Sequence, residues 1–166
     1  MRNKYISWLP AILIMLLIFY LSSKPASVSG ESSLRLTEYI MRLYEKIMGM
    51  QVEEGLRADR LLALDHYIRK TAHVIEYAVL ALAICYPLYV RGLKGGKLWL
   101  WSVLFTAAYA ATDELHQRFV PGRSGELKDV LIDSSGAVLG ALAFLLAVKV
   151  TGKLVRHKKR PELKSE

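Results

Sequence analysis

Two stretches of the chain place acids and histidines inside or at the ends of segments apolar enough to span a bilayer. They read K-T-A-H-V-I-E-Y at 70–77 and T-D-E-L-H-Q-R-F at 112–119. A charged side chain in hydrocarbon costs about 3 kcal/mol or more unless it is paired or wetted, so such groups are candidate functional residues. We expect them to meet in one polar site near a single face of the membrane.

Histidine beside a carboxylate suits general acid–base catalysis, because the carboxylate fixes the tautomer of the imidazole. The candidate catalytic residues are His73, Glu76, Asp113, Glu114 and His116. A second set could bind a ligand through charge or hydrogen bonds: Lys70, Tyr77, Gln117, Arg118, Arg123, Asp129 and Asp133. In that set, Arg118 and Arg123 offer planar donor forks to phosphate or carboxylate.

Three other interpretations use the same side chains. They could form a polar clamp between helices, without chemistry. The H-x-x-E at 73–76 and D-x-x-H at 113–116 are similar to the carboxylate–histidine pairs of di-metal helical bundles. Such ligands suit zinc, manganese or iron, but the partner glutamates are missing, so the metal and any cofactor are unknown. The third interpretation is recognition of a ligand or partner protein, which the sequence does not separate from catalysis.

The elements that must position these groups are predicted to be helices. The chain has 166 residues, 53% of them apolar, which indicates one all-α membrane domain over 1–160 and a short tail end at 161–166. Four transmembrane helices are predicted at about 5–22, 67–90, 98–116 and 130–150. The first could be a signal peptide, but no A-x-A cleavage site follows it, which favours an uncleaved anchor.

Between the first two spans, the spacing of residues 32–48 predicts a helix with apolar residues on one face and charged residues on the other. Ser33 is a candidate N-cap and Gly49 a candidate stop. This amphipathic helix could lie on the membrane surface, cover the bundle or pack on protein alone. A second short helix is expected around 53–64. In the last span, G-A-V-L-G at 136–140 would let two helices approach closely and seat Asp133 against a neighbour.

The net charge of +8 is unevenly distributed, since seven of the 23 Lys and Arg residues lie in the last 18 positions. Placed directly after an apolar span, they favour a cytoplasmic anchor at anionic headgroups over a nucleic-acid-binding tail. We therefore expect a multi-pass protein of the cytoplasmic (inner) membrane with both termini in the cytoplasm, which puts the polar site on the outer face. The single cysteine, Cys85, allows no intramolecular disulfide and is expected to be a packing residue.

Four motifs together resemble the VanZ-like family of membrane proteins over most of the chain. They are S-S-K-P at 22–25, D-x-x-x-x-K-x-x-H-x-x-E-Y at 65–77, D-E-x-H-Q-x-F-V-P-G-R at 113–123 and D-V-L-I-D-S-S-G-A at 129–137. One departure is Asp133, where many relatives are expected to carry Asn. The family is named for a protein associated with resistance to the glycopeptide teicoplanin. The resemblance implies a role at the bacterial cell envelope, with membrane lipids and a lipid-linked cell-wall precursor or glycopeptide as candidate partners. It supplies no reaction, so whether the chain is an enzyme stays open.

Overall fold

The computed structural model describes residues 4–49 and 51–159, and for 153–159 it describes the backbone alone. Six helices follow one another: η1 (Ile6–Trp8), α1 (Leu9–Ser22), α2 (Ala26–Met48), α3 (Glu54–Val90), α4 (Gly95–Gln117) and α5 (Leu127–Lys159). No strand occurs within the described ranges. The predicted all-α class is confirmed.

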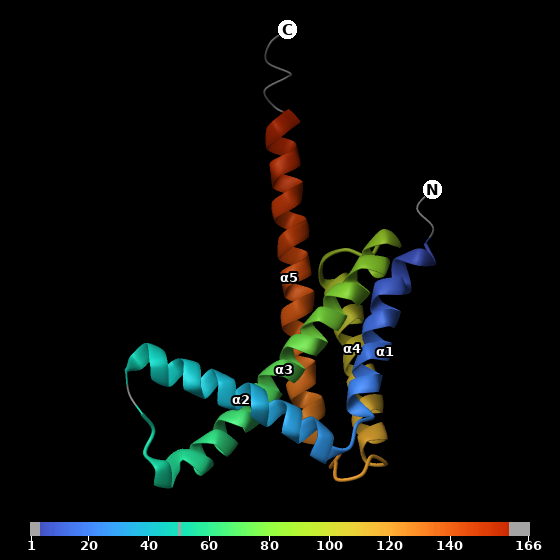
Figure 1. Cartoon of the computed structure of the whole chain (residues 1–166). Coiled ribbons are helices and arrows are strands. Elements are labelled where there is room, and N and C mark those ends of the chain that lie inside the picture. The colour runs from blue at the N-terminus through green and yellow to red at the C-terminus, as the bar shows by residue number, and fades with distance from the viewer. Residues whose placement is uncertain (1–3, 50, 160–166) are drawn as a thin grey trace.

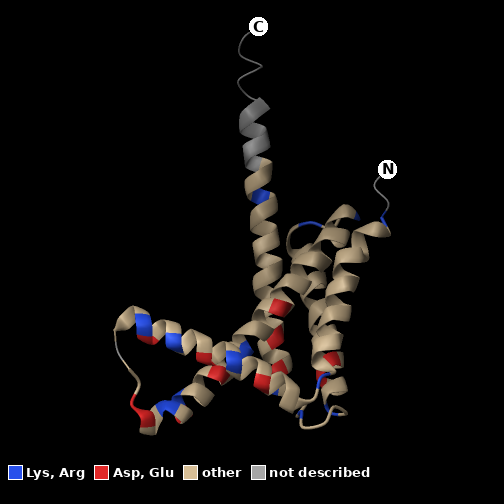
Figure 2. Ribbon diagram, viewed as in Figure 1, with Lys and Arg blue, Asp and Glu red and all other residues tan. Residues whose placement is uncertain are grey.

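The longest helix, α3, organises the molecule (Figure 1). Its C-terminal half packs among α1, α4 and α5, while its N-terminal half and α2 form an arm that projects to one side. The start of α1, the α3–α4 turn and the later part of α5 lie at one end of the bundle, and the α1–α2 turn and α4–α5 loop lie at the other. Figure 2 shows that the described Asp and Glu residues gather on the arm and toward this second end.

Two helices are long and apolar enough to cross a membrane: α3, and α5 over Leu127–Gly152. They contain the predicted spans 67–90 and 130–150. The segment Ile6–Ser22 qualifies only together with α2, and that pair is bent by 102°. The predicted span 98–116 lies in α4, which is not among the qualifying helices. Its uncharged stretch, bounded by Lys97 and Asp113, is only 15 residues long. The structure therefore supports two or three spans, and a fourth stays a prediction.

The arm differs from the prediction in its boundaries. Helix α2 begins at Ala26, directly after Pro25, so Ser33 lies inside the helix and its assignment as an N-cap is wrong. The Ser33 hydroxyl instead donates to buried Asp65 of α3, which also accepts a hydrogen bond from Thr37 Oγ1 at 3.0 Å. Gly49 does end α2, with a left-handed φ of 64° that suits glycine. The expected helix at 53–64 is continuous with the span that follows it.

Close backbone contact joins α3 to α5. A Cβ on Gly136 would lie 2.2 Å from the carbonyl oxygen of Val74, and one on Gly140 would lie 2.1 Å from that of Ala78. No side chain fits at either glycine, which confirms that the small residues let two helices approach closely. One turn earlier on α5, Asp133 is only 1% exposed. The contact therefore seats this aspartate against α3, as predicted.

The bundle core is apolar and contains the cysteine. Tyr77, Leu80 and Ile84 of α3 are buried against residues of α1 and α4. Cys85 is also buried, and its thiol donates to Ser102 Oγ at 3.1 Å across to α4. This placement agrees with a packing residue.

Candidate functional site

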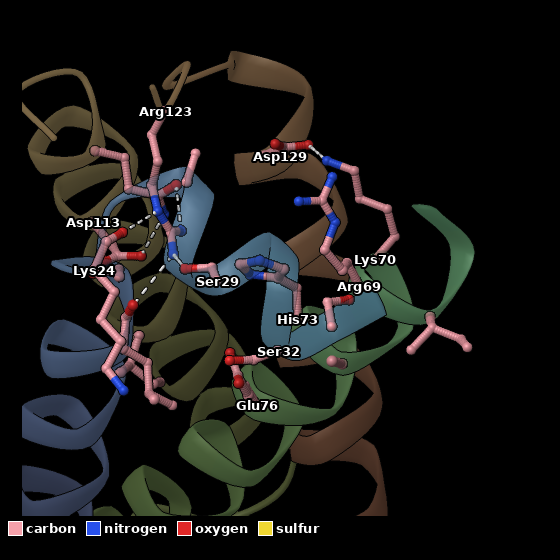
Figure 3. A pocket seen from close by; sticks show the side chains of 18 of the residues that line it. Lys24, Ser29, Ser32, Arg69, Lys70, His73, Glu76, Asp113, Arg123 and Asp129 are labelled. Atoms are coloured by element: carbon pink, nitrogen blue, oxygen red, sulfur yellow. Dashed lines mark hydrogen bonds and ion pairs between the residues drawn. The ribbon is translucent and has the colours of Figure 1, made fainter. Parts of the chain in front are cut away.

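A polar cavity of about 780 Å³ lies at the end of the bundle where the α1–α2 turn meets the α4–α5 loop (Figure 3). Its lining comes from all five α-helices and both connections. Seven of the twelve residues singled out from the sequence line it: Lys70, His73, Glu76, Asp113, Gln117, Arg123 and Asp129. Apolar side chains complete the wall, among them Ile18, Leu21 and Leu36.

The other five candidates lie outside the lining. Tyr77 and Asp133 are buried behind it, and Glu114 is buried near the α4–α5 loop. His116 stacks on Phe19 with ring centroids 4.6 Å apart, and Arg118 is exposed and donates to the carbonyl of Gly125. On α4, therefore, Asp113 and Gln117 share the cavity side, while His116 is turned toward α1.

Asp113 is held by donors from three helices. Its Oδ1 accepts a hydrogen bond from Ser22 Oγ of α1 at 2.6 Å. Its Oδ2 accepts one from the Tyr77 hydroxyl of α3 at 3.2 Å and one from Gln117 Nε2 of α4 at 3.0 Å. Both carboxylate oxygens thus have hydrogen-bond donors, and Asp113 is only 4% exposed. Asp113 ties α1, α3 and α4 together at the cavity wall.

Arg123 joins the α4–α5 loop to the α1–α2 turn. Its Nε donates to the Lys24 carbonyl at 3.0 Å, and one terminal nitrogen donates to Leu21 O and Ser29 Oγ at 3.2 and 2.7 Å. The other terminal nitrogen donates to Gln117 Oε1 at 3.3 Å. Burial lowers the pKa of Arg123, but a guanidinium stays charged in proteins. The fork predicted for phosphate or carboxylate is occupied by the protein itself.

The backbone beside Arg123 makes the same connection. Ala26 N donates to the carbonyl of Pro121 at 3.2 Å. Gly122 has a φ of 74°, and a Cβ there would lie 3.2 Å from that of Ala26. The S-S-K-P and V-P-G-R motifs, about a hundred positions apart in the chain, therefore dock directly on each other.

Two further carboxylates hold the start of α5. Asp129 forms an ion pair with Lys70 of α3 at the cavity rim, where both side chains are about a quarter to a third exposed. Glu114 accepts hydrogen bonds from Gln117 Nε2 at 3.2 Å and from the Glu126 amide at 3.0 Å. Both therefore have structural partners in the described part of the chain.

His73 and Asp133 form a pair between α3 and α5. His73 Nδ1 lies 3.6 Å from an Asp133 oxygen, too far for a hydrogen bond. This nitrogen and both Asp133 oxygens are buried without a hydrogen-bond partner among the described residues. The His73 side chain is 31% exposed and lines the cavity. The carboxylate can therefore orient the imidazole once the contact tightens, as such contacts do when a ligand binds.

Glu76 lies one turn after His73 on α3 and also lines the cavity. It is half-buried and makes no hydrogen bond or ion pair with any described residue. Figure 3 shows its carboxylate at the cavity wall on the same helix as His73. It is an acceptor that the fold leaves available.

The metal interpretation has little geometric basis. Within the described ranges, no three His, Cys, Asp or Glu side chains come together in a way that could hold a metal ion. His73 faces Asp133, whereas His116 faces α1 through Phe19 and Ser23. The two carboxylate–histidine pairs therefore do not combine into one centre.

Hydroxyl groups are the site residues that the sequence did not single out. Ser22, Ser29 and Ser33 all line the cavity, and each bonds to a charged side chain: Asp113, Arg123 and Asp65, respectively. The sequence feature that could have indicated them is the serine-rich stretch at 22–33. It was not singled out because its charged residues show no regular spacing.

The cavity lies within the part of the chain that matches a known family. A family model described as VanZ/LLP1 matches residues 7–148, which include every cavity-lining residue. Among curated proteins and among solved structures, none matches the chain. Because the match covers most of the sequence, the chain belongs to the VanZ/LLP1 family.

Proposed function

We propose that this VanZ-like protein is a multi-pass protein of the bacterial cytoplasmic membrane whose cavity binds the headgroup of an amphiphilic envelope ligand on the outer face. Four spans with both termini in the cytoplasm would place the cavity there. Supporting this topology, the start of α1 and the α3–α4 turn lie at the bundle end opposite to the cavity (Figure 1).

The observation that carries the proposal is a polar cavity whose wall continues into an exposed apolar stripe. On α2, Ser29, Ser32 and Ser33 line the cavity, and Leu36 follows at its edge. Beyond it, Ile40, Leu43 and Ile47 continue at helical spacing and are 37–73% exposed. Polar groups at the cavity and apolar groups beyond it match an amphiphile with its headgroup in the cavity and its chain along α2.

Candidate ligands are membrane lipids, a lipid-linked cell-wall precursor or the glycopeptide itself. A protein that holds such a molecule at the outer face would change what a glycopeptide such as teicoplanin can reach. We expect expression of the wild-type gene in a susceptible host to lower teicoplanin susceptibility, and Glu76→Gln to abolish the effect.

The control is Glu31→Gln, since Glu31 is an exposed residue of α2 that does not line the cavity. It should behave as wild type. Equal teicoplanin susceptibility with and without the gene would contradict the envelope role.

A membrane-embedded enzyme acting on a lipid-linked substrate is the second candidate, and the His73–Asp133 pair favours it. His73 would be the general base and Asp133 the residue that orients its imidazole. If His73→Ala abolishes the phenotype while ligand binding and folding persist, catalysis is favoured. If binding is lost together with the phenotype, His73 contributes to recognition.

A further inference from the structure

The charged groups that line the cavity differ in how free they are to bind a ligand, if the cavity binds one as proposed. Among the cations, Lys70 is paired with Asp129, and Arg123 donates to four acceptors of the protein. The Lys24 ammonium lies 4.8 Å from the centroid of the Tyr20 ring, which is outside the lining. These three cations are already engaged.

Arg69 is only partly engaged and lies at the rim. Its Nε is 3.4 Å from Asp65, and its side chain is 48% exposed. Its terminal nitrogens can therefore meet a phosphate at the mouth of the cavity. Among the described residues, neither His73 nor Glu76 forms an ion pair with Arg69 or with any other lysine or arginine.

Apart from the His73 imidazole, the unengaged groups of the inner cavity wall are acceptors or acids. Glu76 has no partner among the described residues, and the Ser32 hydroxyl donates to Val28 O at 3.1 Å, which leaves its lone pairs available. Behind the wall, Asp133 is 1% exposed, with no lysine or arginine paired to it. A buried carboxylate is costly when unpaired, so this wall favours a positively charged or hydrogen-bond-donating ligand group.

We infer that the headgroup bound here carries a primary ammonium group, held by Glu76 inside the cavity, with any phosphodiester left at the rim near Arg69. An anionic headgroup without an amine could also leave its phosphate at the rim near Arg69, but it would place no positive charge beside the unpaired Glu76 carboxylate. A zwitterionic lipid with an ethanolamine group has the required chemistry.

The test is native mass spectrometry of the full-length, detergent-purified protein with an equimolar mixture of phosphatidylethanolamine and phosphatidylglycerol of identical acyl chains. We expect preferential retention of phosphatidylethanolamine by the wild type. Because a hydrogen bond to a charged group contributes about 1.5–3 kcal/mol, Glu76→Gln should weaken its retention by about tenfold or more. Glu31→Gln should leave it unchanged.

The wild-type comparison needs no variant, so a misfolded mutant cannot hide the answer. Preferential retention of phosphatidylglycerol, or equal retention that Glu76→Gln does not alter, would overturn the ammonium inference while leaving a lipid-binding cavity in place. Retention of neither lipid would overturn the inference and count against the proposed binding function as well.

Discussion

The two sides of the cavity carry similar polar and charged side chains but differ in whether these side chains have hydrogen-bond partners within the protein. On one side, which we call the braced wall (Ser22, Asp113, Gln117 and Arg123, with Tyr77 behind them), the charged groups are engaged by partners within the protein. On the other, the open wall (His73 and Glu76, with Asp133 behind them), the carboxylates and the imidazole nitrogen facing Asp133 lack a hydrogen-bond partner among the described residues.

This difference separates two roles that the sequence could not. A buried polar group left without a partner costs about 1–3 kcal/mol, so a fold normally satisfies it. The braced wall follows that rule and clamps α1, α3 and α4 together. The open wall breaks this rule, because its ionisable groups lack partners, and it does so beside a cavity. Ionisable groups in such a place are candidate functional residues. The clamp and the proposed ligand site are therefore neighbouring parts of one structure.

The largest expected effect comes from breaking the braced wall with Asp113→Ala. The change removes an acceptor from three buried donors, on Ser22, Tyr77 and Gln117, and the Tyr77 hydroxyl has no other acceptor among the described residues. At about 1–3 kcal/mol for each donor, we expect a loss of about 3 kcal/mol or more in the free energy of unfolding. Thermal unfolding of the purified protein in detergent measures it.

The matched variant is Asp113→Asn, which keeps one acceptor oxygen and should lose less stability than Asp113→Ala. An unchanged melting temperature for Asp113→Ala would mean that the clamp does not hold the bundle together. The division between the two walls would then fail.

A smaller effect of the opposite sign is expected on the open wall. Asp133→Asn removes an unpaired buried carboxylate, and the amide can donate to His73 Nδ1. We expect stability to rise by about 1 kcal/mol, because a neutral amide costs less to bury than an unpaired carboxylate. The same thermal measurement decides it, and a loss as large as that of Asp113→Ala would place Asp133 in the clamp.

The smallest effect is expected in the arm, away from both walls. The carboxylate of Glu45 accepts hydrogen bonds from the Val52 amide at 3.1 Å and from Arg57 at 2.7 Å, closing the turn between α2 and α3. The first of these bonds, followed by the second, lowers the pKa of Glu45 below its ordinary 4.5. Its stabilising contribution is therefore complete above about pH 4.5 and is lost as the pH falls through the lowered value.

Hydrogen exchange at the Val52 amide, corrected for intrinsic rates, should accelerate as the pH is lowered through this window. Glu45→Gln, which has no carboxylate to protonate, should show no such step. Protection that stays constant in the wild type down to pH values well below 4.5 would show that Glu45 does not hold the turn.

Much of the local structure was predictable from apolar runs and small residues. The spans at 67–90 and 130–150 and the close approach at Gly136 and Gly140 depend on hydrophobicity and side-chain size, which sequence records directly. The orientation of α4 was not predictable in the same way. The D-x-x-H spacing paired Asp113 with His116, but a helix that packs on several neighbours presents nearby residues to different ones, and His116 is turned to Phe19.

By itself, the sequence determined an all-helical chain of the VanZ-like family with ionisable groups clustered beside apolar helices, because composition, periodicity and motif spacing are local properties. Only the tertiary structure decided which of those groups are engaged. The 102° bend between α1 and α2 brings serines of α2 to the cavity, and the contacts of Arg123 with the α1–α2 region and Gln117 engage all three of its guanidinium nitrogens. Hydrogen-bond satisfaction depends on partners far apart in the chain, which is why Glu76 and Asp133 could be recognised as unpartnered only in three dimensions.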